Sequence, residues 1–319
     1  MPAIQFGFSI PLAAPYAAPN FKTLDYKSIK QAVLTCEEFG YDALWAADHL
    51  GYHGIGSSIF ECWTLLSALA AVTRRVRLGP LVLCNGYRHP SMIAKMAATL
   101  DVVSNGRLDF GIGAGNNKVE HVAYGLPWFD KPSTRIQRMV EGIEVVKRMW
   151  TEAKPSFKGK HYEIQEAICE PKPIQKPYPP IWIGGAGEKL TLRATAKYAQ
   201  GWNHWGGVSV EIFRRKLEAL EKHCLDLGRG FNTIEKSLET RVIISEDPLE
   251  IRVLAARFAP DASLEELKRS QIIGTPDEVV RRLEEYVSVG AGYFMLWFLD
   301  FPSLKGMRLF AERVMPCFK

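Results

Sequence analysis

Asp48 and His49 are the adjacent residues best suited to acid–base chemistry in this sequence. They follow the short apolar stretch Ala43–Ala47, which favours a β-strand. A carboxylate beside an imidazole can fix the tautomer of the ring and raise its basicity, as a general acid or base requires. The alternative is a capping carboxylate with a solvated histidine. Their position directly after a predicted strand favours the catalytic interpretation.

Two glycine-rich segments also follow apolar stretches. The first, GIGAGNN (111–117), lacks the GxGxxG spacing of a dinucleotide-binding turn, and the second, GGAGEK (184–189), lacks the spacing of a P-loop. The second segment nevertheless stands between a predicted strand and a predicted helix. Exposed backbone N–H groups at a helix start, with the helix dipole behind them, suit one phosphate group. The alternative is a tight turn that binds no ligand.

Other kinds of catalytic motif are missing from the sequence. It contains no HExxH metal motif, no carboxylate cluster, no CxxC pair among its six cysteines and no GxSxG nucleophile motif, so we expect no metal site. Glu120 and His121 are interpreted as a structural ion pair or packed side chains. Acid–base residues with a phosphate turn, but without a metal or a nucleophile, predict an organic cofactor that carries the difficult step.

The elements that would position these residues alternate along the chain. Eight strand-length apolar stretches are each followed by a helical segment, which predicts a (β/α)8 TIM barrel with reactive groups at the C-terminal strand ends. A doubly wound sheet is the rival, but it would need nucleotide-binding glycines after the first strand, where FGFSIPLAAP lacks their spacing. The predicted strands are Ile4–Ile10, Ala43–Ala47, Val76–Leu83, Arg107–Ile112, Ile181–Ile183, Gly201–Asn203, Leu238–Ile244 and Tyr293–Leu299.

Insertions interrupt the alternation in the second half. Residues 157–169 predict an excursion with a hairpin, the proline-rich residues 170–180 an extended connector, and residues 249–273 an irregular helical insertion. We expect one domain that spans residues 1–319.

Composition and charge restrict the class of protein. The net charge of +5 is mild and the seven histidines are scattered, so nucleic-acid binding is not expected. No run of about 20 apolar residues is present that could span a membrane. The first residues lack the basic and apolar regions of a signal peptide, and the cysteines suit a reducing compartment. These features predict a cytoplasmic protein that does not act at a membrane.

Several longer segments resemble a known family. The chain is similar to the luciferase-like superfamily of flavin and deazaflavin oxidoreductases, and most of all to the branch that uses the deazaflavin coenzyme F420. The resemblance is carried by GYDALWAADHL (40–50), by residues 61–115 from ECWTLLSALAAV to RLDFGIGAG, by EHVAYGLP (120–127) and by PPIWIGGAGEKLTLRATAKYAQGWN (179–203).

The resemblance implies roles for individual residues. Asp48 and His49 would flank the reactive carbon, residues 113–115 would lie against the cofactor ring, and residues 184–189 would hold its phosphate. Family members often have a non-proline cis peptide at the end of strand three, which predicts one at Leu81–Val82. The cofactor-binding residues implied in this way are Leu81, Val82, Gly113, Ala114, Gly115, Asn116, Gly184, Gly185, Ala186, Gly187 and Lys189.

Two departures from the family pattern concern the reaction. Asn116 stands where many relatives have Trp or Glu, so an acid proposed for some members is missing here. The first strand ends in Ser9-Ile10-Pro11 and not in the carboxylate that some deazaflavin enzymes place there. The reaction type of those enzymes is therefore not transferred.

We predict a coenzyme F420-dependent oxidoreductase that moves a hydride between the deazaflavin and a small organic substrate. His49 would exchange the substrate proton and Asp48 would orient it. One alternative is a monooxygenase that uses flavin mononucleotide (FMN), and another is a non-catalytic flavin- or deazaflavin-binding barrel. The stripe of Lys189, Arg193 and Lys197 would attract the anionic tail of F420, unless it is only a solvated face. Family habit predicts a homodimer or a higher homo-oligomer.

Overall fold

A parallel β-ring with eight positions forms the centre of the computed structural model, which describes residues 3–11, 24–51 and 59–318. The third position is filled by two short strands, of which β3 pairs with β2 and β4 pairs with β5. This arrangement confirms the predicted (β/α)8 barrel. The ring strands are β1 (Gln5–Ser9), β2 (Ala43–Ala46), β3 (Arg77–Pro80), β4 (Leu83–Cys84), β5 (Phe110–Gly113), β8 (Ile181–Gly184), β9 (Gly201–His204), β10 (Glu235–Ile244) and β12 (Tyr293–Phe298).

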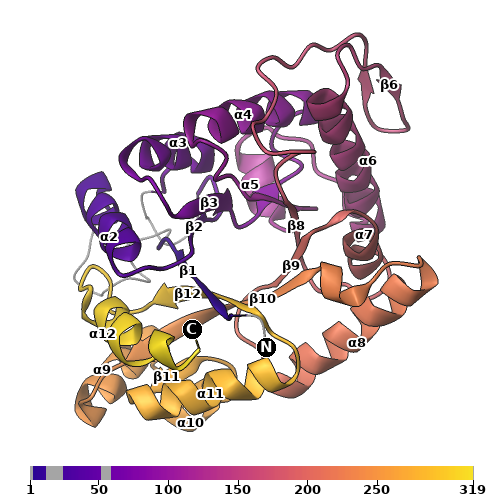
Figure 1. Cartoon of the computed structure of the whole chain (residues 1–319). Coiled ribbons are helices and arrows are strands. Elements are labelled where there is room, and N and C mark those ends of the chain that lie inside the picture. Colours follow the sequence, from indigo (N-terminus) through magenta and orange to yellow (C-terminus); the bar gives the residue numbers. More distant parts are fainter. Residues whose placement is uncertain (1–2, 12–23, 52–58, 319) are drawn as a thin grey trace.

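Helices surround the ring on its outer side (Figure 1). Several of them begin at a side-chain cap; for example, Ser263 and Glu266 form a capping box. In the described part of the chain, no helix has the length and apolar character needed to cross a membrane. The helices are α2 (Tyr26–Glu38), α3 (Cys62–Val72), α4 (Pro90–Val103), α5 (Lys118–Ala123), α6 (Pro132–Thr151), α7 (Thr191–Tyr198), α8 (Val210–Asp226), α9 (Pro248–Phe258), α10 (Leu264–Lys268), α11 (Pro276–Ser288) and α12 (Lys305–Arg313).

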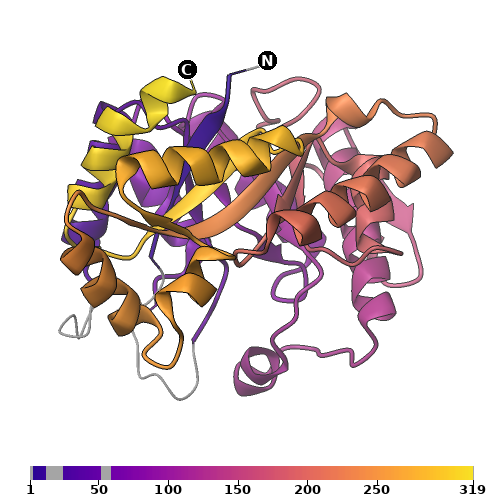
Figure 2. The ribbon, with the colours of Figure 1, turned by 90° about the horizontal axis from the view of Figure 1, so that it is seen from below.

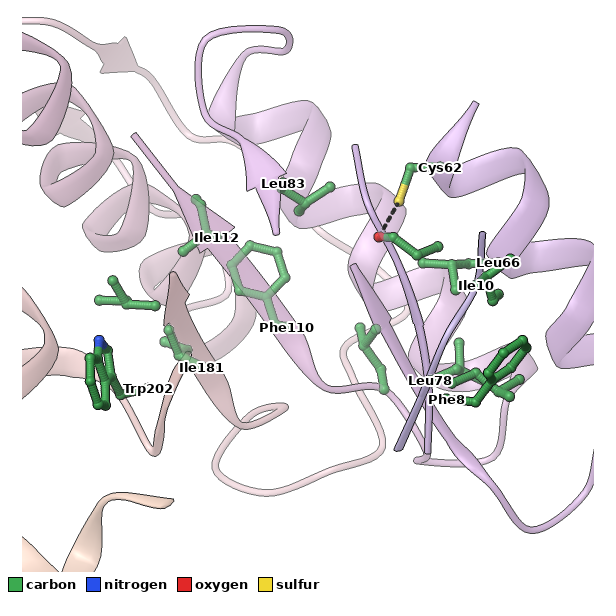
Figure 3. Close-up of a cluster of buried hydrophobic side chains, with 14 of the residues drawn as sticks. Phe8, Ile10, Cys62, Leu66, Leu78, Leu83, Phe110, Ile112, Ile181 and Trp202 are labelled. Carbon is green, nitrogen blue, oxygen red and sulfur yellow. Dashed lines mark hydrogen bonds between the residues drawn. The ribbon is translucent and has the colours of Figure 1, made fainter. Parts of the chain in front are cut away.

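The two faces of the strands point into different apolar clusters. Along β2, Leu44 packs between ring and helices, whereas Trp45 points into the barrel interior with Trp182 and Tyr293. Figure 3 shows side chains of the outer layer, in which the thiol of Cys62 donates a hydrogen bond to the Ala46 carbonyl at 3.4 Å. This period-two alternation decides which residues of each strand can reach a site inside the ring.

The loops that follow the strands gather at one end of the barrel. Figure 2 shows α5 and α9 at the end opposite the chain termini. Since parallel strands all point the same way, the segments after β2, β5, β8 and β10 meet there. This is the end at which the sequence placed the reactive groups.

Two strands differ from the prediction. The predicted strand Val76–Leu83 is divided into β3 and β4, with a cis peptide at Leu81–Val82 between them, as the resemblance implied. The predicted helical insertion 249–273 ends in a short strand, β11 (Ile272–Gly274), which pairs with β10. Three residues are too few to show a hydrophobic period. The predicted hairpin is confirmed as β6 (Phe157–Lys158) and β7 (Glu163–Ile164).

Candidate active site

A cavity of about 690 Å³ opens at the C-terminal ends of the strands. Its walls come from the segments that follow β2, β4, β5, β8 and β9 and from the inner faces of β10 and β12. Both predicted catalytic residues line it, and so do Leu81, Val82, Gly113, Ala114, Gly115, Asn116, Gly184 and Gly185. The structure therefore brings most of the predicted site together around one space.

Glu120 is the carboxylate that contacts His49. Its Oε2 lies 3.0 Å from Nδ1 of His49, and the Glu120 side chain is fully buried. Oε1 accepts hydrogen bonds from the backbone N–H groups of Leu50 at 3.0 Å and Gly51 at 3.1 Å, and Oε2 accepts one from the Tyr87 hydroxyl. Burial alone would raise the pKa of Glu120, but these hydrogen bonds together lower it to about 2.

An ionised Glu120 fixes the tautomer of His49. A carboxylate can only accept hydrogen bonds, so Nδ1 of the ring carries the hydrogen. Nε2 is then the ring nitrogen that carries no hydrogen and could accept one. Glu120 comes from α5, 71 residues after His49. The sequence analysis interpreted Glu120 as a structural residue beside His121 and assigned it no place in the site.

Asp48 does not orient His49, contrary to the prediction. Its two oxygens accept hydrogen bonds from the Arg88 guanidinium at 2.8 and 3.0 Å, and one also accepts from the backbone N–H of Cys84 at 2.9 Å. The Asp48 side chain is fully buried in this ion pair. Asp48 therefore ties the end of β2 to β4 and to the loop that follows it.

The glycines beside the cavity make room for protein side chains. A Cβ atom at Gly113 or Gly184 would come within 2.8 or 2.7 Å of Val82 Cγ2. Gly115 has a φ of +79°, and a Cβ there would meet the Cys84 sulfur at 2.6 Å. The bulge at Val82 thus fills the space between β5 and β8. The sequence interpretation assigned this space to a cofactor ring alone.

The turn at 184–189 presents only part of its backbone to the cavity. The N–H of Gly185 donates to the Asn203 carbonyl at 3.1 Å, so it is engaged in the ring. Within the described residues, the N–H groups of Ala186 and Gly187 have no acceptor. Thr191, the first residue of α7, lines the cavity and was not predicted, whereas Lys189 is exposed outside the lining. The turn leads into the start of α7, where an anion would be favoured.

Glu239 is a second carboxyl group that the sequence analysis missed. It lies on β10 and lines the cavity, and its Oε1 accepts a hydrogen bond from the Ser9 hydroxyl at 3.4 Å. Burial raises the pKa of Glu239. Glu239 alternates with the core residues Leu238 and Val242 inside the predicted strand. That period-two pattern is the signal that would have pointed Glu239 into the barrel.

Cys84 lines the same cavity but is not a nucleophile. Burial raises the pKa of its thiol to about 12, and its sulfur lies 3.7 Å from Nε2 of His121. A thiol with such a pKa is protonated at neutral pH, and the protonated form is a weak nucleophile.

Known proteins resemble this chain over most of its length. A protein 28% identical over 97% of this chain and 98% of its own length is named F420-dependent glucose-6-phosphate dehydrogenase, from Microbacterium testaceum (strain StLB037). Another relative, from Mycobacterium bovis (strain BCG / Pasteur 1173P2), is named phthiodiolone/phenolphthiodiolone dimycocerosates ketoreductase. It is 30% identical over 72% of this chain and 62% of its own length.

Solved structures support the same fold. An F420-dependent secondary alcohol dehydrogenase in complex with an F420-acetone adduct has a TM-score of 0.85, with 19% identity over 99% of both chains. A monooxygenase from Streptomyces bottropensis has a TM-score of 0.82, with 24% identity over 99% of this chain and all of its own. The model of the luciferase-like monooxygenase family matches residues 4–267, and the chain therefore belongs to that family.

Proposed function

We propose that this protein is a coenzyme F420-dependent oxidoreductase that transfers a hydride between the deazaflavin and a small organic substrate. The observation that carries the proposal is the buried Glu120 held against Nδ1 of His49 at the wall of a glycine-edged cavity. Relatives that cover nearly the whole chain are named as F420-dependent dehydrogenases, which supports the choice of cofactor.

The residues present fit such a cofactor. The cavity volume of about 690 Å³ falls within the range of roughly 300–1,000 Å³ that is typical of small-molecule sites. The Leu81–Val82 bulge and residues 113–116 would lie against the ring. The unbonded N–H groups of Ala186 and Gly187, with Thr191 at the start of α7, would hold the phosphate. Bound F420 supplies a ring carbon that accepts or gives a hydride.

The protein's own part in the reaction is to hold and move a proton. His49, with Nδ1 bound to Glu120, would take a proton from the substrate oxygen at Nε2 in one direction and return it in the other. Glu120 would act as a positioning residue, because it touches His49 but does not itself line the cavity. The Asp48–Arg88 pair would keep the loop that bears His49 in register with β4.

A turnover assay tests this function. The protein is incubated with F420 and a panel of alcohols, aldehydes and hydroxylated acids, and both the redox state of F420 and the oxygen concentration are followed. We expect substrate-dependent reduction or oxidation of F420 without oxygen consumption. Oxygen-dependent product formation with reduced FMN, and none with F420, would identify the monooxygenase alternative. Binding of a cofactor without any turnover would identify a non-catalytic barrel.

A further inference from the structure

The guanidinium group of Arg241 lies at the wall of the cavity, and none of the side-chain contacts described above involves it. Arg241 lies on β10 two residues after Glu239 and therefore shares the inner face of the ring. The guanidinium donates no hydrogen bond to any described residue, and it forms no ion pair with them. Its Nε is buried, so the two terminal amino groups are the donors that remain accessible from the cavity.

The other arginines of the cavity region are satisfied by the protein. Arg88 is paired with Asp48, and Arg135 donates to the carbonyl oxygens of Gly115 and Phe129. The segments outside the described residues contain no Asp or Glu, so they hold no side-chain carboxylate for Arg241. A cation at a partly enclosed wall with idle donors is costly unless an acceptor arrives from outside.

Aromatic side chains hold Arg241 in place. Its guanidinium carbon lies 5.1 Å from the centre of the Phe258 ring and 5.4 Å from that of Trp297. The Arg241 backbone N–H donates to the Gln271 side chain at 3.1 Å, which fixes that end of β10. Packing against two rings restricts the guanidinium without using its hydrogen-bonding capacity. The fork is thus preorganised for a planar or tetrahedral anion.

We propose that Arg241 binds an anionic group of the substrate, a carboxylate or a phosphate, so the substrate is a small organic anion. This inference rests on the proposed function, since it takes the turn at 184–189 as the place of the cofactor phosphate. Arg241 lies on β10, two strands away from that turn around the ring. Glu239, two residues earlier on the same strand face, accepts a hydrogen bond from Ser9 and attracts the Arg241 cation without forming an ion pair with it.

Titration of the cofactor-free protein tests the proposal. Calorimetry would measure the binding of inorganic phosphate and of propionate, with neutral propionamide as the reference. Arg241→Met keeps much of the side-chain length and removes the charge, and should weaken both anions by roughly 10- to 100-fold, the usual worth of hydrogen bonds to a charged group. Arg241→Lys keeps the charge but loses the forked pair of donors, so its anion affinity should lie between those of the wild type and Arg241→Met.

Three further measurements separate anion binding at Arg241 from a general loss of positive charge and from an effect on the cofactor. Arg252→Met, on the exposed face of the adjacent helix α9, should bind both anions as the wild type does. Glu239→Gln removes a negative charge from the same wall and should tighten binding. In Arg241→Met, the affinity for F420 should stay unchanged, because the cofactor would not use this cation.

Three results would overturn the assignment. The first is equal anion affinity in the wild type and Arg241→Met. The second is a wild type that does not prefer propionate to propionamide. The third is a result in which Thr191→Val weakens phosphate binding and Arg241→Met leaves it unchanged. In that case the glycine turn at 184–189 alone would hold the anion. If Arg241→Met does not fold, two other measurements decide. One is the anion affinity of Arg241→Lys. The other is whether phosphate protects Arg241 of the wild type from modification by an arginine-specific reagent. The anion titrations contain no F420, so their outcome is independent of the turnover assay.

Discussion

Nδ1 of His49 lies 3.0 Å from Oε2 of Glu120, although 71 residues separate the two along the chain. The contact joins the segment after β2 to the helix after β5, across the mouth of the barrel. Because the buried carboxylate is ionised, it determines which ring nitrogen can take part in proton exchange. The pair therefore connects the architecture of the barrel to the chemistry proposed for it.

Glu120→Gln tests the positioning role of Glu120. An amide can still contact Nδ1, but it can present its NH2 group to the ring and no longer favours one tautomer. We expect turnover to fall by roughly 10- to 100-fold, the range for loss of a charge-assisted hydrogen bond, with little change in cofactor affinity. The measurement is a comparison of kcat and cofactor Kd over a pH series. A variant with the wild-type pH profile would show that Glu120 serves structure alone.

Stability should depend on pH through the same carboxylate. The pKa of Glu120 is about 2 in the folded protein, against an ordinary value of 4.5. Ionised Glu120 therefore contributes stability above about pH 4.5, and this contribution is lost as the pH falls towards 2. The difference in unfolding free energy between the wild type and Glu120→Gln should shrink over that window. A constant difference from pH 7 to pH 3 would contradict the assigned shift.

His49→Ala tests proton transfer directly. General acid–base help is typically worth roughly 10²–10⁴-fold, so turnover should drop by about that factor. Cofactor binding should change little, since other residues would hold the ring and the phosphate. His161, which lies between β6 and β7 and does not line the cavity, offers a control histidine for the same substitution. Full activity in His49→Ala would remove His49 from the mechanism.

Thr191→Val tests the phosphate site. The substitution keeps the side-chain shape but removes a hydroxyl group at the start of α7, so the affinity for F420 should fall by about tenfold. Thr195→Val, one turn later on the same helix and also buried, is the control. Gly187→Val should weaken binding further, because its Cβ would press on the Thr191 hydroxyl at 2.9 Å. Wild-type affinity in both Thr191→Val and Gly187→Val would place the phosphate elsewhere.

The cationic stripe of Lys189, Arg193 and Lys197 predicts a salt effect. All three side chains are exposed, and none forms an ion pair among the described residues. Each contact with an anionic cofactor tail would be worth only about 0–1 kcal/mol and would weaken with salt. F420 should therefore lose more affinity with salt than an analogue without the glutamate tail. Arg193→Glu combined with Lys197→Glu should remove most of that difference; equal salt slopes in the wild type would leave the stripe as ordinary surface.

The sequence predicted the barrel well because the spacing of apolar residues and the glycines that end helices are local signals. Trp45 and Leu44 show the alternation in two adjacent residues, and residues 184–191 show a strand, a turn and a helix start. The partners of His49 and Asp48 could not be predicted in the same way. Glu120 and Arg88 reach them across the barrel mouth, and the pairing depends on how far separate loops extend in space. Glu239 was within reach of sequence analysis, through its alternation with Leu238 and Val242.

Equilibrium titration of the cofactor-free protein with F420 and with FMN tests the central claim most directly. Absorbance and fluorescence changes of each cofactor give its dissociation constant. The proposed function predicts saturable binding of F420 that is tighter than that of FMN and is weakened by Thr191→Val. Tight binding of FMN with no saturable binding of F420 would contradict it.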